Sequence, residues 1–421
     1  MEIGVIGAGY VGLTTAACFA HLGHRVTCAE IDRARVEKLN AAQVDLAEPE
    51  LAALVTDGIK AGRLRFVADA VDTADAEVIF LCVGTPGIGD GRADLSALED
   101  VVAALGPKLR PNAVLVNKST VPVGSAVRVR ELLGDRDDVG VVSNPEFLSE
   151  GRAVRDFLKP SRVVIGGDDP GALAHVAELY REMRAPMLVT DSASAEIVKY
   201  AANAFLATKV SFVNAMANLC EAVGADVREV GLGLGHDPRI GFEYLEPGPG
   251  FGGACLPKDV RALLYSAERA GYDFALLRGV LEVNEEQRDR VVSKVRSLAG
   301  GTLDGATVGV LGLTFKAHTD DVRESPALAV INRLLAEGAS VQAFDPAAHA
   351  VELPVELRHD GYEAARGANV LVVLTEWPEF RSLDYARVAS EMRRAAIVDA
   401  RNLLNPEELE RYGFEYVGVG R

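Results

Sequence analysis

EIGVIGAGYVG, the stretch at residues 2–12, decides how the chain begins to fold. Its apolar, β-branched start is typical of a buried strand, and Gly7, Gly9 and Gly12 follow in the spacing GxGxxG. A helical pattern comes next, and RVTCAE at residues 25–30 restarts a strand. Strand, glycine turn, helix and strand in this order predict a βαβ unit whose turn accepts a dinucleotide pyrophosphate at the helix N-terminus.

The end of the second strand indicates which dinucleotide binds. Glu30 lies about 20 residues beyond the turn, where a carboxylate accepts hydrogen bonds from the adenosine ribose and repels a 2′-phosphate. We therefore expect NAD rather than NADP, with Arg33 and Arg35 as the features that favour NADP. The alternative is a glycine turn used only for packing. The residues expected to bind the cofactor here are Gly7, Gly9, Tyr10, Val11, Gly12 and Glu30.

Further apolar, β-branched runs alternate with helical or turn-rich segments, at residues 77–83, 113–117, 139–142 and 162–166. This alternation predicts a doubly wound parallel sheet. From about Ser192 the pattern becomes helical, and residues 195–223 contain neither Gly nor Pro. After the pair Gly300-Gly301, strands are expected again at residues 307–313, 340–344, 369–374 and 395–399.

The predicted fold is therefore α/β, with an N-terminal Rossmann domain and a C-terminal Rossmann-like domain. We expect the first over residues 1–191, a helical segment with a long central helix over 192–299, and the second over 300–421. The C-terminal domain restarts the strand-glycine pattern but lacks the full fingerprint. It is expected to bind a different ligand from the first.

Composition excludes several classes of protein. The 421-residue chain has a formal charge of −17 and no basic stripe, which argues against a nucleic-acid or anionic-membrane partner. No apolar run approaches the roughly 20 residues that span a bilayer. An acidic residue 2, followed at once by a strand, predicts no signal peptide, so we expect a soluble, cytoplasmic protein. The histidines show no ligand spacing, and no metal is expected.

FGGACLPKD, at residues 251–259, contains the cysteine with the strongest functional signal. Cys255 lies in a glycine-rich loop, and Lys258 close behind it favours the thiolate. The other cysteines lie in apolar strand or helix patterns and are expected in the core; they are Cys18, Cys28, Cys82 and Cys220. The scattered set predicts free thiols rather than disulfides. A thiolate beside a dinucleotide suggests that a carbonyl product is captured, oxidised again and released as an acid.

Polar residues on the long helix form a second candidate site. Lys199 and Asn203 are four residues apart and share one helix face. The lysine could stabilise an alkoxide, and the asparagine could hold a sugar hydroxyl or a water. The alternative is a solvated stripe.

Two loops that follow expected strands could also bind ligands. NPEFLSE at residues 144–150 and Thr120 lie where ligands collect at the carboxyl ends of parallel strands. Glu146 or Glu150 could instead be a helix cap or a surface acid. In the C-terminal third, Phe315 could stack on a base, and Lys316 and Arg323 could bind phosphate; a solvated charged loop is the alternative.

Taken together, these residues resemble the nucleotide-sugar 6-dehydrogenases over essentially the whole chain. Besides the Lys199/Asn203 helix, the resemblance rests on GAGYVG, CVGTP at 82–86, KSTVPVG, NPEFLSEG, PGPGFGGACLPKD, GLTFK, DDVRESP and LTEWPEF at 374–380. Two positions depart from the family pattern. Glu30 stands where aspartate is usual, and Ala254 where serine is common.

The resemblance implies roles for matching residues. Catalysis would involve Cys255 as nucleophile, with Lys199, Asn203, Asp259, Thr120, Glu146 and Glu150 around the reacting carbon and its water. The dinucleotide would also meet Thr85, Thr120, Glu150, Lys258 and Arg323. The sugar nucleotide would contact Phe147, Leu148, Lys199, Asn203, Arg239, Tyr244, Gly250, Phe251, Gly252, Phe315 and Lys316. Arg239 resembles an arginine that reaches the substrate across a dimer interface, which implies a homodimer.

The same resemblance implies NAD-dependent, four-electron oxidation of a nucleotide sugar at C6, through a thiohemiacetal and a thioester on Cys255. DPRIG at residues 237–241, LTEWPEF and DARN at 399–402 resemble the branch that oxidises UDP-glucose. A GDP-mannose enzyme is the nearest alternative, followed by the acetamido-sugar branch. The β-hydroxyacid dehydrogenases fit poorly because they lack the cysteine. A non-enzymatic, redox-sensing NAD-binding regulator is the remaining alternative.

Overall fold

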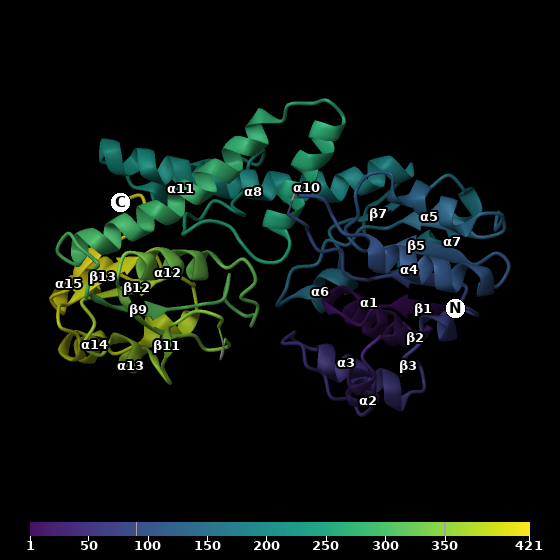
Figure 1. Cartoon of the computed structure of the whole chain (residues 1–421), viewed down its shortest axis with the longest axis horizontal. Helices are drawn as coiled ribbons and strands as arrows, with labels where there is room; N and C mark the ends of the chain where they lie inside the picture. Colours follow the sequence, from purple (N-terminus) through teal and green to yellow (C-terminus); the bar gives the residue numbers. More distant parts are fainter. Residues whose placement is uncertain (90, 349–350) are drawn as a thin grey trace. The chain divides into compact units, whose positions relative to one another are not determined.

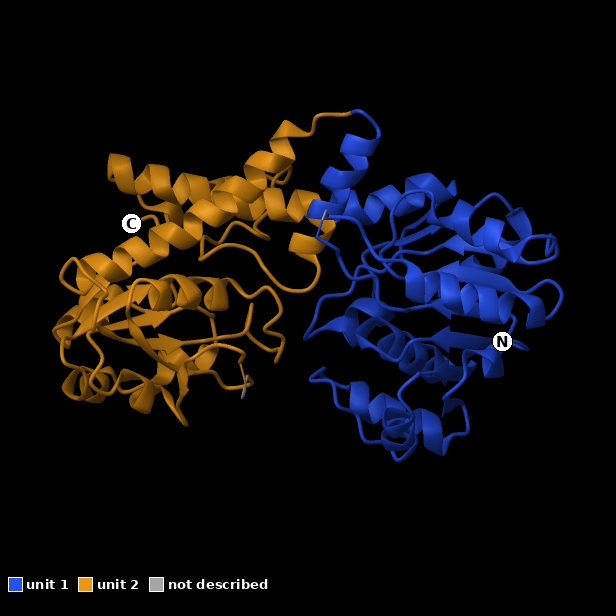
Figure 2. Cartoon of the chain, viewed as in Figure 1, with its two compact units in different colours: residues 1–202, 261–271 blue, residues 203–260, 272–421 orange. Residues whose placement is uncertain are grey.

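The computed structural model describes residues 1–89, 91–348 and 351–421. The chain divides into two compact units, shown in Figure 2. Unit 1 comprises Met1–Ala202 and Arg261–Gly271, and unit 2 comprises Asn203–Val260 and Tyr272–Arg421. Each unit contains its own sheet and its own apolar core. The three-part division expected from the sequence stays a prediction.

Unit 1 is built on an eight-stranded sheet in the order β3-β2-β1-β4-β5-β6-β7-β8. Its strands are β1 (Glu2–Ile6), β2 (Arg25–Ala29), β3 (Leu64–Val67), β4 (Val78–Leu81), β5 (Val114–Asn117), β6 (Gly140–Ser143), β7 (Val163–Gly166) and β8 (Met187–Thr190). Neighbouring strands are parallel except β6 and β7, which pair antiparallel through Ser143 and Gly166. The predicted doubly wound sheet is therefore confirmed, with two added strands that run the other way.

Helices cover the strands of unit 1, and the inner strands β4, β5 and β7 are wholly buried as a result. The α-helices are α1 (Tyr10–His21), α2 (Arg33–Asn40), α3 (Leu51–Lys60), α4 (Ser96–Leu105), α5 (Ser125–Leu133), α6 (Ala153–Leu158) and α7 (Pro170–Tyr180). Short 3-10 turns lie at η1 (Ala70–Thr73), η2 (Gly106–Lys108) and η3 (Arg181–Met183).

Unit 2 contains a six-stranded parallel sheet in the order β11-β10-β9-β12-β13-β14. Its strands are β9 (Thr307–Leu311), β10 (Ser340–Phe344), β11 (Glu356–Leu357), β12 (Val370–Val373), β13 (Ala396–Asp399) and β14 (Glu415–Val417). The covering helices are α12 (Pro326–Ala336), α13 (Gly361–Ala365), η4 (Pro378–Ser382), α14 (Tyr385–Glu391) and α15 (Pro406–Arg411). This order repeats the first six positions of the unit 1 sheet, which confirms the predicted Rossmann-like domain.

The predicted long helix is α8 (Ser192–Val223), labelled in Figure 1, which begins in unit 1 and ends in unit 2. It is followed by α9 (Val227–Gly235), α10 (Leu256–Arg269) and α11 (Ala275–Leu298). In unit 2, Val213 and Ala217 of α8 share one core with Val291 and Val295 of α11 and with the strand β9. Burial of this apolar seam stabilises both long helices.

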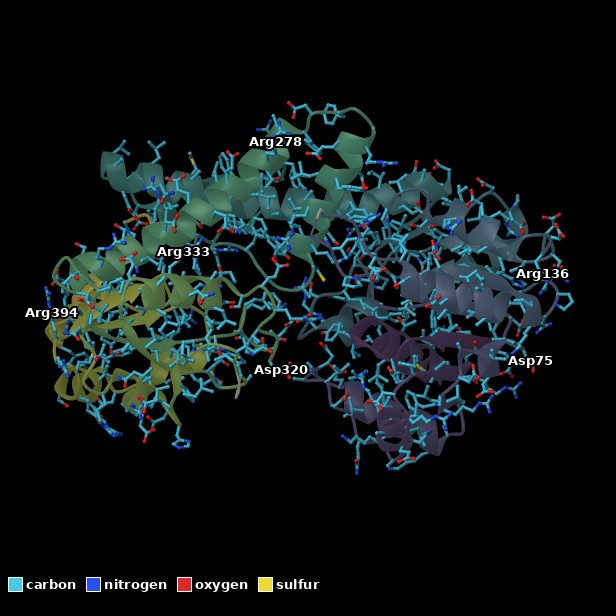
Figure 3. The ribbon with its side chains drawn as sticks, in the orientation of Figure 1. Asp75, Arg136, Arg278, Asp320, Arg333 and Arg394 are labelled. Atoms are coloured by element: carbon cyan, nitrogen blue, oxygen red, sulfur yellow. The ribbon has the colours of Figure 1, made fainter. Side chains whose placement is uncertain are left out.

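Charged side chains surround both units (Figure 3). Arg333 of α12 forms ion pairs with Glu285 and Asp289 of α11, both at 2.7 Å, and Arg136 in unit 1 pairs with Asp138 at 2.8 Å. Such exposed pairs contribute roughly 0–1 kcal/mol each. Within the described ranges, no helix combines the length and the apolar character needed to cross a bilayer.

Candidate functional site

The glycine turn between β1 and α1 has the geometry that a dinucleotide requires. Gly7 has a φ of +94°, and a Cβ there would lie 2.7 Å from the carbonyl oxygen of Cys82. A Cβ on Gly12 would lie 1.8 Å from the Gly7 oxygen, so the turn itself requires both glycines. A Cβ on Gly9 would meet nothing within 4 Å. Gly9 therefore leaves open space, at the position where a pyrophosphate would approach.

The start of α1 is free to receive an anion. Its N-cap, Gly9, provides no side-chain cap, and the first turn contains no acidic residue. The first backbone N–H groups of a helix have no partner inside the helix, and they carry its partial positive charge. The residues present thus fit the phosphates of NAD.

The carboxylate of Glu30 directly follows β2, beside this turn. It accepts hydrogen bonds from the backbone N–H groups of Ala8, at 3.2 Å, and Asp32, at 3.1 Å. Arg35 lies 3.5 Å from Glu30 and 2.9 Å from Asp45. Two carboxylates therefore neutralise the arginine that could otherwise attract a 2′-phosphate.

Glu146 and Lys199 form a buried ion pair in unit 1. Their side-chain O and N atoms are 2.8 Å apart, and the two side chains are only 7% and 6% exposed. Burial by itself raises the pKa of Glu146. The Lys199 charge and hydrogen bond, together with the backbone N–H of Leu148 at 2.6 Å, outweigh burial and lower this pKa below its usual value. The solvated-stripe alternative for Lys199 and the surface-acid alternative for Glu146 are wrong.

Other predicted residues of unit 1 lie around these elements. The Thr85 hydroxyl donates to the backbone oxygen of Thr120 at 2.8 Å, which joins two predicted cofactor residues. The Phe147 ring lies 5.6 Å from the Lys199 ammonium. The Tyr10 hydroxyl contacts Glu48, accepts from the Gly151 N–H at 2.9 Å, and so ties the start of α1 to the loop that contains Glu150. Val11 follows Tyr10 in the first turn of α1.

Cys255 is the exposed one of the five cysteines, and the other four are buried as predicted. It immediately precedes α10, and its carbonyl oxygen accepts the Asp259 N–H at 2.9 Å. Cys255 therefore lies at the N-terminus of a 14-residue helix, where the partial positive charge of a helix can stabilise an anion such as a thiolate. The structure therefore separates one exposed thiol from four buried thiols.

Asp259, on the first turn of α10, is 1% exposed. Asn203 donates to its carboxylate at 2.6 Å, and the Lys258 ammonium lies 2.9 Å from its other oxygen. The solvated alternative is wrong for Asn203 as well, since it is 7% exposed. Unit 2 thus places the Asp259 carboxylate, with an amide and an ammonium next to it, on the helix that Cys255 precedes.

Polar side chains on the long helices hold the glycine-rich loop before Cys255. Asn284 of α11 accepts from the Phe251 N–H at 2.7 Å and donates to the Phe251 oxygen at 3.2 Å. Gln287 donates to the Gly248 oxygen at 3.0 Å, and Asn214 of α8 accepts from the Gly248 N–H at 2.9 Å. These three positioning residues were not predicted. Their only signal in the sequence is an amide inside an otherwise apolar helix face.

The glycines of this loop permit close packing inside unit 2. A Cβ on Gly252 would lie 2.2 Å from the Glu324 oxygen, and a Cβ on Gly253 would lie 2.9 Å from the Phe315 ring. Gly250 has a φ of +110°. The structure thus brings the predicted residues Phe251, Gly252 and Phe315 together.

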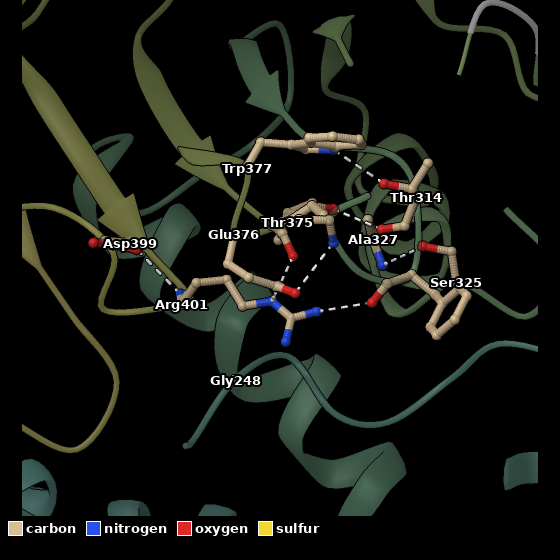
Figure 4. A network of polar contacts seen from close by, with 12 residues as sticks. Gly248, Thr314, Ser325, Ala327, Thr375, Glu376, Trp377, Asp399 and Arg401 are labelled. Atoms are coloured by element: carbon tan, nitrogen blue, oxygen red, sulfur yellow. Dashed lines mark hydrogen bonds and ion pairs between the residues drawn. The ribbon is translucent and has the colours of Figure 1, made fainter. Parts of the chain in front are cut away.

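The loop with Phe315 and Lys316 is held by a polar network, shown in Figure 4. Arg401 donates to the Phe315 oxygen at 3.1 Å and lies 3.2 Å from Glu376. The Trp377 indole donates to the Thr314 hydroxyl at 3.1 Å. The segments LTEWPEF and DARN therefore fix the loop that contains two predicted substrate residues.

Three predicted residues lie at the surface of unit 2. Arg323 pairs with Asp321 at 2.7 Å, and Arg239 pairs with Asp237 at 2.6 Å. The Arg239 side chain is 86% exposed. Tyr244 is 39% exposed, with a φ of +64°. Each of these two arginines forms an ion pair with a carboxylate two residues away.

Comparison with known proteins covers almost the whole chain. Models of the UDP-glucose/GDP-mannose dehydrogenase family match residues 1–184 as the NAD binding domain, 193–286 as the central domain and 309–406 as the UDP binding domain. The UDP-glucose 6-dehydrogenase of Pseudomonas aeruginosa is 45% identical over 100% of this chain and 98% of its own. That of Rhizobium meliloti is 42% identical over 100% of both chains.

A solved structure is also similar over nearly its full length. The UDP-glucose dehydrogenase of the hyperthermophilic archaeon Pyrobaculum islandicum superposes with a TM-score of 0.92 at 37% identity. The match covers 100% of this chain and 97% of the other.

Proposed function

Because the chain belongs to the UDP-glucose/GDP-mannose dehydrogenase family, we propose that this NAD-dependent oxidoreductase oxidises the C6 alcohol of UDP-glucose to the carboxylate of UDP-glucuronate. The observation that carries the proposal is the single exposed thiol of Cys255, placed at the N-terminus of α10 beside the Asp259–Asn203 pair. Full-length similarity to enzymes that bear this name supports the choice of substrate.

The first oxidation requires a proton acceptor and a fixed alcohol. Asp259, held by Asn203 and Lys258, accepts the C6 hydroxyl proton directly or through water. The Lys199 ammonium stabilises the negative charge that develops on the oxygen. NAD, when bound at the glycine turn, supplies an acceptor for the hydride that leaves C6.

The second oxidation requires Cys255. Its thiolate attacks the aldehyde carbon, a C–S bond forms, and the carbonyl electron pair moves to oxygen. The thiohemiacetal retains a C–H bond, so loss of a second hydride gives a thioester. Water that Glu146 deprotonates then attacks the acyl carbon, and the sulfur leaves as a thiolate. The alcohol, two NAD⁺ and one water thereby yield the carboxylate, two NADH and three protons.

The variant Cys255→Ala tests this route. It should form no uronate, because no thioester can form without the sulfur. Undiminished uronate output from that variant would refute the thioester route.

Glu150 and Thr120 are proposed to orient the water and the cofactor.

The proposed sugar-nucleotide site uses two loops of unit 2, the glycine-rich loop before Cys255 and the loop that contains Phe315 and Lys316. Lys316 offers a cation to the diphosphate, and a base can stack on Phe315. The remaining proposed contacts are Phe147, Leu148, Tyr244, Gly250, Phe251 and Gly252, with Lys258 and Arg323 toward the dinucleotide. The exposed Arg239 is proposed to reach the substrate of a second copy in a homodimer. We also propose that the enzyme acts in the cytoplasm, where reducing conditions keep its five cysteines as thiols.

GDP-mannose is the competing substrate, since the family includes enzymes for both sugars. The measurement that decides is the number of NADH formed per sugar nucleotide consumed. A ratio of two with UDP-glucose and no turnover with GDP-mannose is the expected result. Faster oxidation of GDP-mannose would reverse the assignment.

A further inference from the structure

Lys118 is a buried lysine of unit 1 that the proposed reaction does not use. Lys118 directly follows β5 and is only 4% exposed. Its ammonium donates to the Asn144 side-chain oxygen at 3.2 Å and to the Tyr180 hydroxyl at 3.3 Å. Across the described residues, it makes no ion pair with a carboxylate. Both of its acceptors are neutral.

Aromatic rings complete the surroundings of this ammonium. Its nitrogen lies 5.8 Å from the centroids of Phe80 and Phe157, and 5.7 Å from that of Tyr180. Ring faces attract cations, but they replace only part of the hydration that burial removes. Burial accordingly lowers the pKa of Lys118 to about 8. A methionine would fill the same apolar space without this cost, so retaining a charge here points to a function.

The contacts of Lys118 lead directly to Glu146. Asn144 also accepts from Tyr180 at 2.6 Å and donates to the Val164 oxygen at 2.8 Å, so its side chain is fixed on several sides. Glu146 follows two residues later, after Pro145. The only residue between Asn144 and Glu146 is therefore a proline, whose ring restricts the backbone at that point.

The charge of Lys118 acts on the same carboxylate. The titratable and charged groups around its ammonium are Cys82, Glu146, Lys199 and Tyr180. Among these, Glu146 attracts the ammonium and Lys199 repels it. Coulomb interactions are reciprocal, so the Lys118 charge favours the ionised form of Glu146 and disfavours the protonated form of Lys199.

We propose that Lys118 is a positioning residue, which fixes the Asn144-Pro145-Glu146 turn and supplies a second buried positive charge that keeps Glu146 ionised for water activation. The inference rests on the proposed function, in which Glu146 deprotonates the hydrolytic water. Lys118 touches neither substrate nor cofactor in this scheme.

The first test is the pH dependence of kcat, at saturating UDP-glucose and NAD, in Lys118→Met. Without the buried charge, the Glu146 carboxylate should bind a proton at least about threefold more tightly. The acid limb of the profile should therefore move to higher pH. The matched control is Lys108→Met, which removes an exposed lysine of unit 1 and should leave the limb in place. A folded, active Lys118→Met whose acid limb coincides with that of the wild type would overturn the proposal.

The second test needs no turnover. In protein with ¹³Cε-labelled lysine, the Lys118 resonance, assigned by its absence from Lys118→Arg, should titrate near pH 8. In Glu146→Gln, this titration should occur at lower pH, because the attracting anion is gone. An unchanged midpoint would refute the coupling even if Lys118→Met does not fold. Failure to oxidise UDP-glucose would refute the proposed function and leave this result intact.

Discussion

Replacing Lys118 by Met should make the unfolding free energy less dependent on pH above neutrality. Burial lowers the pKa of this lysine from 10.5 to about 8 in the folded chain. Each pH unit of difference corresponds to about 1.36 kcal/mol. The charged lysine therefore costs the folded state roughly 3 kcal/mol at pH 7.

The sign follows from proton binding. Between about pH 8 and 10.5 the unfolded chain holds the lysine proton more strongly than the folded chain does. The stability of the wild type should therefore rise through this window relative to Lys118→Met. Below pH 8 the penalty is fully present, and the difference between the two proteins should be constant. Lost hydrogen bonds to Asn144 and Tyr180, worth about 1 kcal/mol each, shift the whole difference without changing its slope.

Urea unfolding at several pH values between 7 and 11 measures this effect. The contributions of all other titratable groups to the unfolding free energy cancel when the two proteins are compared at each pH. The difference in unfolding free energy should change by roughly 3 kcal/mol across the range. A difference that stays constant within about 0.5 kcal/mol would show that Lys118 is not buried as a costly cation.

Three further outcomes are expected. Asn284→Ala should lower the unfolding free energy by about 1–3 kcal/mol and reduce kcat more than it changes KM, because the Phe251 backbone loses both partners; a kcat equal to the wild-type value would contradict this. The pKa of Glu146 is lowered in the folded chain, so the stability that its ion pair with Lys199 contributes is present above the unfolded-state pKa and is lost as pH falls through the folded-state pKa. The unfolding free energy of Glu146→Gln should therefore fall less steeply with decreasing pH than that of the wild type. Glu30→Ser should raise the kcat/KM for NADP relative to NAD, measured with both cofactors at fixed sugar.

The strands that the sequence did not predict share one property. They are β3, β8, β11 and β14, and each lies at an edge of its sheet. Inner strands are covered on both faces and consist of continuous apolar runs, which sequence patterns detect. Edge strands face solvent: all but the last residue of β8 are exposed, and β11 is exposed throughout. Their sequences therefore resemble those of loops.

The candidate site was predicted only where a motif marks it. Cys255 stands out because packing in an apolar core does not explain a cysteine in a glycine-rich loop. Lys199 allowed two interpretations, since helical spacing does not tell which face a partner carboxylate will cover. Asn284 gave almost no signal, because its role depends on a backbone 33 positions away in the sequence. Long-range polar contacts of this kind become visible only once the chain is folded.

The most direct measurement concerns the sulfur of Cys255. Glu146→Gln, incubated with UDP-glucose and NAD, should accumulate the acyl-enzyme, because the water that releases it is no longer activated. Mass spectrometry of the digested protein should find the uronyl adduct on the peptide that contains Cys255. Formation of NADH by this variant without any adduct on that peptide would contradict the account.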